Sequence, residues 1–344
     1  ERYEAVSNGR KFKKNPPVLN LDTNVSPVMY QKEMYTLDLY CVRLKLFIRG
    51  TWDWVEVNLP TRYLKNLIKS MSDGGKLESP SLVLRYHKLY LDFPIQFPSI
   101  SFPKTPLEGR RMLGVDLGVN NGAVCSVMDA CGTIEVRVFD PFTSERDRLN
   151  HLLNRLRKVA RASGTGQPLS AFYTKLDGVK ANYARQLSHW IVDTAQKHGV
   201  YGIVMENLGR MKPKRKKDKI HHWCKKKIYH LTKGIAMRYG IRVFLINPKN
   251  TSALAFDGSG RVERNWGNYS LCTFKNGKRY HADLNASYNI AARYFIREYK
   301  KSMPETAWSE CMAKVPALSR RTGCTLSTLR ELCACKTQAA ARPV

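Results

Sequence analysis

LGVDLGVNN, residues 113–121, is an apolar segment that contains a single acid, Asp116. Its apolar residues predict a buried strand. A carboxylate buried alone among apolar neighbours costs several kcal/mol, so Asp116 needs a metal ion, a partner or water. Gly114 and Gly118 flank the acid, and glycines let another backbone or a phosphate come close.

The segments around this strand predict an α/β domain. Two short apolar strands follow at 122–128 and 133–139, which makes a three-stranded meander. Beyond them the periodicity predicts helices at about 144–162 and 170–198, a strand at 200–208, a helix at 220–240, a strand at 241–248, and a last helix at 281–301. A meander followed by alternating helices and strands is the order of an RNase H-like (RuvC) mixed sheet flanked by helices.

Residues 1–108 differ in pattern, because apolar and polar side chains alternate along much of their length. This period of two predicts half-buried strands, and a proline-rich linker at 97–106 ends the region. We therefore expect a β-rich domain at 1–108, an α/β domain at 109–299 with inserted basic helices at 142–199 and a loop-rich insert at 251–281, and a partly disordered C-terminal tail at 300–344.

The chain is strongly basic. It carries 58 Lys and Arg residues against 28 Asp and Glu residues, a formal net charge of +30. Solubility does not require such an excess. A polyanionic partner explains it, and nucleic acid is favoured over a membrane because no basic amphipathic anchor stands out. No apolar run is long enough to predict a transmembrane helix, and no signal peptide is visible.

Nine cysteines are scattered at irregular spacing. The odd count and the spacing argue against a disulfide framework. A reducing compartment fits them best, so we expect a cytoplasmic protein.

Two further acids stand at the ends of apolar segments. Glu206 closes the strand at 200–208, and Asp283 begins the last helix. Each acid alone has a structural explanation; Asp283, for instance, could serve only the dipole of its helix. Together with Asp116 they are hard oxygen ligands of the kind that Mg²⁺ prefers. Two bridged ions could activate a water and stabilise the leaving oxygen in phosphodiester hydrolysis.

Four blocks resemble those of a known family: GVDLGVNN (114–121), IVMENL (203–208), INPKNTS (246–252) and HADLNASYNIAARY (281–294). Over roughly residues 20–300 the chain resembles the TnpB (OrfB) proteins of bacterial insertion sequences. These are RNA-guided DNA endonucleases with a RuvC-like domain, related to the type V CRISPR effectors. The resemblance implies that Asp116, Glu206 and Asp283 are catalytic and bind two Mg²⁺ (or Mn²⁺) ions.

The resemblance also implies the partners. A guide RNA from the transposon end would select a double-stranded DNA target, in the bacterial cytoplasm near the nucleoid. Residues 1–108 would be the family's wedge domain, and residues 109–299 the nuclease domain. Before Asp116 only TRYLKNLIKSM (61–71) has a helical pattern. The helical recognition lobe of the family is therefore expected to be reduced or truncated.

The insert departs from the family pattern. Many relatives carry a Cys₄ zinc ribbon there, but the candidate ligands between Thr251 and Asp283 are Cys272 and His281 alone. A structural zinc needs four ligands, so we expect no zinc. We expect instead a cysteine-poor target-binding insert stabilised by an apolar cluster of Phe256, Trp266, Tyr269, Leu271 and Phe274.

Two basic groups are candidates for nucleic-acid contact. One follows Glu206 and contains Lys212, Lys214, Arg215, Lys216, Lys217, Lys225, Lys226 and Lys227. The other lies on the helix after the third strand and contains Arg155, Arg157, Lys158 and Arg161. Most charge runs are solvated faces. Proximity to Glu206 favours phosphate contact for the first group, and the resemblance implies an RNA-facing role for the second.

Two alternatives stay open. The chain could be a nuclease-silent RNA- or DNA-binding regulator or transposition accessory protein, against which the complete set of acids argues. It could also be a junction nuclease or a DDE-type transposase with the same fold. We expect the RNA-guided DNA endonuclease, because the wedge-like region and the NPKNTS block (247–252) match the family.

Overall fold

The computed structural model describes residues 28–38, 41–85, 88–98, 101–118, 122–162, 170–208, 216–264, 267–268 and 270–340. The chain folds into two compact units, Glu1–Ser99 and Ile100–Val344. Among the described helices, none is both long and apolar enough to cross a membrane.

The first unit consists mainly of short strands, which the alternating pattern predicted. An antiparallel sheet has the order β1-β2-β3, with β1 at Tyr35–Leu37, β2 at Cys41–Ile48 and β3 at Thr51–Asn58. Helix α2 (Thr61–Ser72) follows. Two strand pairs complete the unit: β4 (Lys76–Leu77) with β7 (Ile95–Gln96), and β5 (Ser81–Arg85) with β6 (Lys88–Asp92). Its small core is formed by Met29, Tyr35, Val42 and Leu44.

The second unit contains a five-stranded mixed sheet in the order β10-β9-β8-β11-β12. The strands β8 (Met112–Asp116), β9 (Val124–Met128) and β10 (Ile134–Phe139) form an antiparallel meander. The strands β11 (Gly202–Glu206) and β12 (Arg242–Ile246) continue the sheet in parallel with β8. The predicted mixed sheet flanked by helices, in RNase H-like order, is thereby confirmed.

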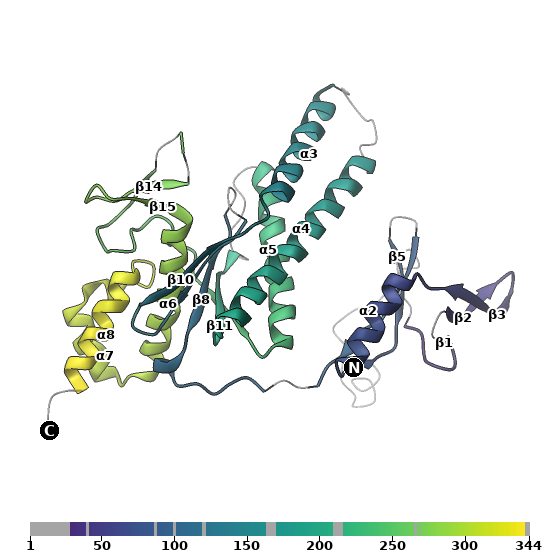
Figure 1. Ribbon diagram of the computed structural model, residues 1–344, viewed down its shortest axis with the longest axis horizontal. Helices are drawn as coiled ribbons and strands as arrows, with labels where there is room; N and C mark the ends of the chain where they lie inside the picture. The colour runs from purple at the N-terminus through teal and green to yellow at the C-terminus, as the bar shows by residue number, and fades with distance from the viewer. Residues whose placement is uncertain are drawn as a thin grey trace, which may run out of the picture. The chain divides into compact units, whose positions relative to one another are not determined.

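Helices cover both faces of this sheet (Figure 1). Alternate residues of a strand point to opposite faces. Leu113 and Val115 of β8 join the core formed with α4 (Ser170–Lys197) and α5 (Lys216–Arg238). Met112 of β8 joins the core formed with α6 (Ala282–Ser302). Helix α3 (Thr143–Ala162) packs on α4 through buried leucines of both helices.

Helix α6 lies against Gly114 of β8 with no room for a side chain there. A Cβ atom at Gly114 would lie 2.4 Å from the Ser287 carbonyl oxygen and 2.9 Å from the Ala291 Cβ. The hydroxyls of Ser287 and Ser126 of β9 are 3.0 Å apart, within hydrogen-bond distance. Asp283 precedes Ser287 by about one helical turn, so this contact fixes the position of the first turn of α6 against the sheet.

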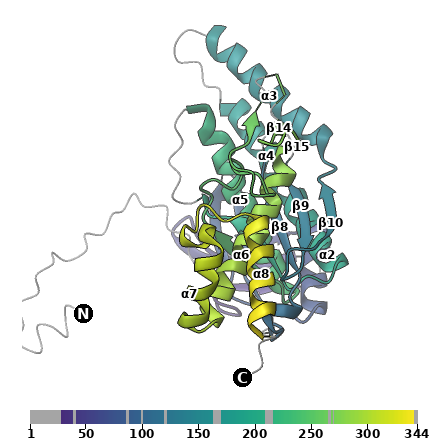
Figure 2. The ribbon, with the colours of Figure 1, turned by 90° about the vertical axis from the view of Figure 1, so that its left-hand side faces the viewer.

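The C-terminal tail differs from its predicted partial disorder. Helix α7 (Glu305–Lys314), the 3-10 turn η3 (Pro316–Ser319) and helix α8 (Leu326–Ala340) fold beside α6 (Figure 2). Trp308, Leu326, Leu329 and Leu332 enter the same core as α6. These apolar residues are sparse among Ala, Thr and Cys, so their own pattern is weak, and packing on α6 supplies the stability of the tail helices.

The cysteines also depart from the expectation of no disulfide framework. Cys131, in the turn between β9 and β10, forms a disulfide with Cys333 of α8 across a sequence separation of 202. On α7 and α8, Cys311 and Cys335 approach to 2.9 Å between their sulfur atoms. Spacing along the chain could not indicate the disulfide, because tertiary packing of the tail on the meander brings the two cysteines together.

The insert between β12 and α6 forms an antiparallel sheet of β13 (Glu263–Arg264), β14 (Leu271–Thr273) and β15 (Arg279–His281). Phe256 packs against Phe274 and Tyr280, with ring centroids 5.4 and 5.0 Å away. Two members of the predicted apolar cluster, Phe256 and Phe274, therefore meet. Two others, Trp266 and Tyr269, lie outside the described residues.

Two glycine substitutions test the packing of α6. We expect Gly114→Ala to destabilise the protein by about 1–3 kcal/mol, because the added methyl group overlaps the α6 backbone. Gly178→Ala is the control: this exposed helical glycine has nothing within 4 Å of an added Cβ, so alanine should stabilise α4 by about 0.5–1 kcal/mol. Urea denaturation measures both. Equal effects of the two substitutions would contradict the close packing at Gly114.

Candidate functional site

Asp116 and Glu206 stand at the same edge of the sheet. Asp116 is the last residue of β8, and Glu206 is the last residue of β11. These neighbouring strands are parallel, with Gly202 opposite Met112 and Val204 opposite Gly114. Continuing this register by two residues sets Glu206 opposite Asp116, at the carboxyl edge where ligands bind in sheets with parallel strands.

Asp283 completes the group from the first turn of α6. Burial is the main cause that holds the pKa of Asp116 well above its usual range, and the charges of Glu206 and Asp283 raise it further. The three predicted acids, Asp116, Glu206 and Asp283, thus form one electrostatic group, the acid cluster. In the part of the chain that the structure describes, no group of three or more His, Cys, Asp or Glu side chains is gathered closely enough to hold a metal ion.

The Asp116 carboxylate is buried without a hydrogen bond. The residue is 8% exposed, and no described residue donates a hydrogen bond to its side chain. The positive charge of Lys225 offsets part of the rise in the pKa of Asp116. A buried acid with two like charges nearby and no donor is unfavourable, and a bound cation would relieve it.

Asp140, just after β10, is an equally buried acid with a structural role. It is also 8% exposed. Its carboxylate accepts hydrogen bonds from the backbone N–H groups of Ala123 and Phe142, each at 3.1 Å, and pairs with Arg146 at 3.3 Å. Such donors stabilise the ionised form. Asp116 has none of them, so the two acids differ in environment and not in depth.

Thr251 holds the Glu206 carboxylate in place. The Thr251 side chain, in a residue 1% exposed, hydrogen-bonds Oε1 of Glu206. Burial raises the pKa of Glu206, while the Thr251 hydrogen bond and the charges of Lys225 and Arg293 lower it. Sequence reasoning quoted Thr251 within a motif but gave it no role. The INPKNTS block was the signal that could have identified it.

The possible donor atoms of the acid cluster are of the kind that magnesium binds, although the three described carboxylates are not gathered into a group that could hold a metal ion. All its possible donors are carboxylate oxygens, which are the hard ligands of Mg²⁺. Both oxygens of Asp116 and the Oε2 of Glu206 have no hydrogen bond from the described residues. Oxygens without a protein donor in a buried site are available to coordinate a cation.

A cavity of about 200 Å³ opens beside Glu206. Lys225, Lys226, Tyr229 and His230 of α5 line it, together with Asn207. Sequence proximity had predicted that Lys225 and Lys226 lie near the acids, and both line this cavity. The charge of Lys225 acts on both Glu206 and Asp116, and a cation at this position can attract an anionic group next to the acid cluster.

The other predicted basic residues are only partly described. Lys212, Lys214 and Arg215 lie outside the described residues, as do the side chains of Lys216, Lys217 and Arg157. Lys227 is half-buried on α5. Arg155, Lys158 and Arg161 are exposed on α3, whose leucines pack on α4. A row of exposed cations suits a polyanion, and the nucleic-acid contacts stay a prediction.

The contrast between Asp116 and Asp140 gives a stability test without metal. Because the pKa of Asp116 is raised by burial, its ionisation costs stability as pH rises from about 3.9, the unfolded value, through the folded value. We expect Asp116→Asn to raise the melting temperature in EDTA at neutral pH, with the gain shrinking towards pH 4. Asp140→Asn should lower stability by about 1–3 kcal/mol through lost hydrogen bonds. A destabilised Asp116→Asn variant would contradict this account.

Comparison with known proteins places the fold. No protein-family model matches the chain, and no curated protein matches it. Among solved structures, CasPhi-2 (Cas12j) bound to crRNA aligns with a TM-score of 0.43, 12% identity and coverage of 84% of this chain and 66% of that chain. The mini-RNA-guided endonuclease CRISPR-Cas_phi3 aligns with a TM-score of 0.49, 14% identity and coverage of 73% of this chain and 57% of that chain. A Cas12f1–sgRNA–target DNA complex gives a TM-score of 0.51, 18% identity and coverage of 85% of this chain and 68% of that chain, so the fold is similar to that of Cas12f1.

Proposed function

We propose that this chain is an RNA-guided DNA endonuclease that hydrolyses phosphodiester bonds at the acid cluster with the help of Mg²⁺. The observation that carries the proposal is the Asp116 carboxylate, which is buried, has no hydrogen bond from the described residues, and experiences the charges of Glu206 and Asp283. Such an arrangement is costly for folding alone and suits a cation site.

Each residue of the site has a task in this proposal. The metal, when bound, would supply a Lewis acid and an activated water, with two ions as the expected number. Asp116 and Glu206 would hold it from strand ends, and Asp283 from the first turn of α6. Thr251 would orient Glu206 through its hydrogen bond. Lys225 and Lys226, which line the adjoining cavity, would attract the DNA phosphate.

The assignment of nucleic-acid partners rests on charge and resemblance. The net charge of +30 suits a long polyanion. One solved structure with a fold similar to this chain is a Cas12f1–sgRNA–target DNA complex, and the sequence motifs resemble those of transposon-encoded TnpB proteins. We infer that a guide RNA from the transposon end selects the DNA by base pairing. The first unit would act as the wedge domain, which helps to hold the guide RNA and the target DNA.

One observation favours a second candidate, a nuclease-silent RNA- or DNA-binding accessory protein. The described acids, histidines and cysteines do not form a ready group of metal ligands. A silent protein would keep the basic surface and lose metal-dependent cleavage, so the two candidates differ in one measurement.

Substitution of the acids separates these candidates. We expect Asp116→Ala, Glu206→Ala and Asp283→Ala each to reduce DNA cleavage by roughly 100-fold or more. Loss of a residue that only hydrogen-bonds a metal ligand already lowers metal affinity or activity by about 10–100-fold. Retention of co-purified RNA should be unchanged. Asp193→Ala, an exposed acid on α4, is the control. Sequencing the RNA bound to the purified protein defines the guide, and matched DNA with Mg²⁺ is the substrate. Full activity of Asp116→Ala would overturn the acid assignment.

Thr251 gives a separate test of positioning. We expect Thr251→Val to raise the Mg²⁺ concentration needed for half-maximal cleavage by about 10–100-fold, because the side chain that orients Glu206 is lost. Thr251→Ser keeps the hydroxyl and should restore most of the affinity. If serine and valine behave alike, the hydrogen bond to Glu206 has no role in metal binding.

A further inference from the structure

A second cavity, of about 530 Å³, opens beside α6 on the side of the C-terminal tail. It is bounded by the end of β12, the second half of α6, and the segment from Trp308 to Cys324. Its volume falls within the range typical of small-ligand sites. We call it the α6 cavity.

The α6 cavity is strongly cationic. No acidic side chain is among its described lining residues. Five basic side chains line it: Arg293, Arg297, Lys300, Lys301 and Arg321. Such a concentration of positive charge in one hollow attracts an anion.

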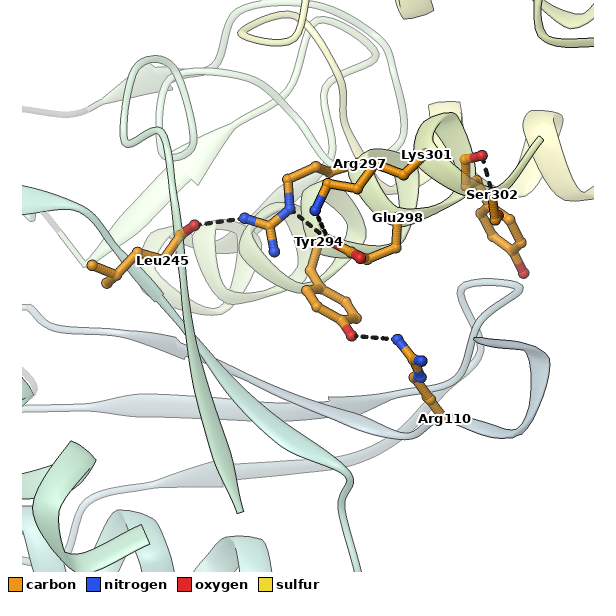
Figure 3. Close-up of polar contacts among 8 residues, drawn as sticks. Arg110, Leu245, Tyr294, Arg297, Glu298, Lys301 and Ser302 are labelled. Carbon is orange, nitrogen blue, oxygen red and sulfur yellow. Dashed lines mark hydrogen bonds and ion pairs between the residues drawn. The ribbon is translucent and has the colours of Figure 1, made fainter. Parts of the chain in front are cut away.

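Three of these cations already have partners. Arg293 is buried and donates to the carbonyls of Asn247, Lys249, Thr322 and Cys324. Arg297 donates a hydrogen bond to the Leu245 carbonyl at 2.9 Å and shares the Glu298 carboxylate with Lys301 (Figure 3). These residues hold the wall of the cavity together.

The other two cations form no ion pair with a described residue. Lys300 and Arg321 are exposed and form no ion pair with any described residue. The Lys300 ammonium lies 5.6 Å from the centroid of the Trp308 ring, and no contact of Arg321 with a described acid or ring exists. Both charges can therefore meet a ligand without breaking a structural bond.

The wall beneath these cations is apolar. Ile246, Ile296, Trp308 and Leu318 line it. Trp308 is 6% exposed, and its indole N–H is buried without an acceptor among the described residues. An inorganic anion would leave the apolar wall unused. A nucleotide uses both parts, because its phosphate is anionic and its base is flat and largely apolar.

We propose that the α6 cavity binds one unpaired nucleotide of a bound RNA strand. Lys300 and Arg321 hold its phosphate, and the base lies against the apolar wall. Single-stranded RNA is recognised mainly through such splayed-out bases. The choice of RNA over DNA rests on the proposed function; the cavity and its charge do not depend on the acid cluster.

The test uses the full chain in EDTA and a short single-stranded RNA that carries 4-thiouridine. Photo-crosslinking should attach the RNA to peptides that line the cavity, at residues 245–247, 293–301 or 308–324. The double variant Lys300→Ala/Arg321→Ala should lose this crosslink, and its plot of log Kd against log salt should flatten by about 0.7, the value for one phosphate of a single strand. The control pair Lys104→Ala/Lys314→Ala removes the same charge from exposed positions that do not line the cavity.

An equal change in salt dependence for the two pairs would overturn the proposal, as would parent crosslinks that map only outside the segments that line the cavity, 245–247, 293–301 and 308–324. Equal crosslinking by a DNA oligonucleotide with 4-thiothymidine would overturn the choice of RNA. Because cleavage is not measured, these outcomes are independent of whether the acid variants support the nuclease.

Discussion

The contact between α6 and Gly114 is the constraint on which the site depends. With no side chain at Gly114, the helix backbone approaches β8 closely, and the first turn of α6 comes near enough to the strand for the Asp283 charge to act on Asp116. Parallel pairing with β11 brings Glu206 to the same edge. Three acids from distant parts of the chain thus share one region because two backbone packings fix their positions, and no bond between the acids draws them together.

The burial of the acids in this arrangement opposes folding. Burial raises the pKa values of Asp116 and Glu206, and the charges of Glu206 and Asp283 raise that of Asp116 further, which means that the ionised forms of both acids are costly. Lys225, Thr251 and Arg293 offset part of that cost. Asp140 demonstrates that the same sheet can bury an acid with donors around it. The lack of donors at Asp116 is therefore local, as expected where function and stability compete.

The sequence predicted the sheet well, because strand order follows from apolar segments and their periodicity along the chain. It could also place Asp116 and Glu206, since acids that end parallel strands share an edge. It could not predict the helices α7 and α8, because their few apolar residues form no clear pattern along the chain and are buried only by packing against α6. The Cys131–Cys333 pair and the Thr251–Glu206 hydrogen bond were hidden for the same reason: both join positions far apart in sequence through tertiary packing.

The charges of α6 are segregated along its length. Asp283 lies in its first turn, and Lys300 and Lys301 lie in its last turn, the distribution that the helix dipole favours. Between them, Arg293 and Arg297 donate to carbonyls at the end of β12 and just beyond it, so the edge strand of the sheet is covered by arginines of α6. Arg293 also bonds the tail at Thr322 and Cys324, and its charge reaches Glu206. One helix therefore connects the acid cluster to the cationic α6 cavity, and Arg293 belongs to both, because it lines the cavity and its charge acts on Glu206.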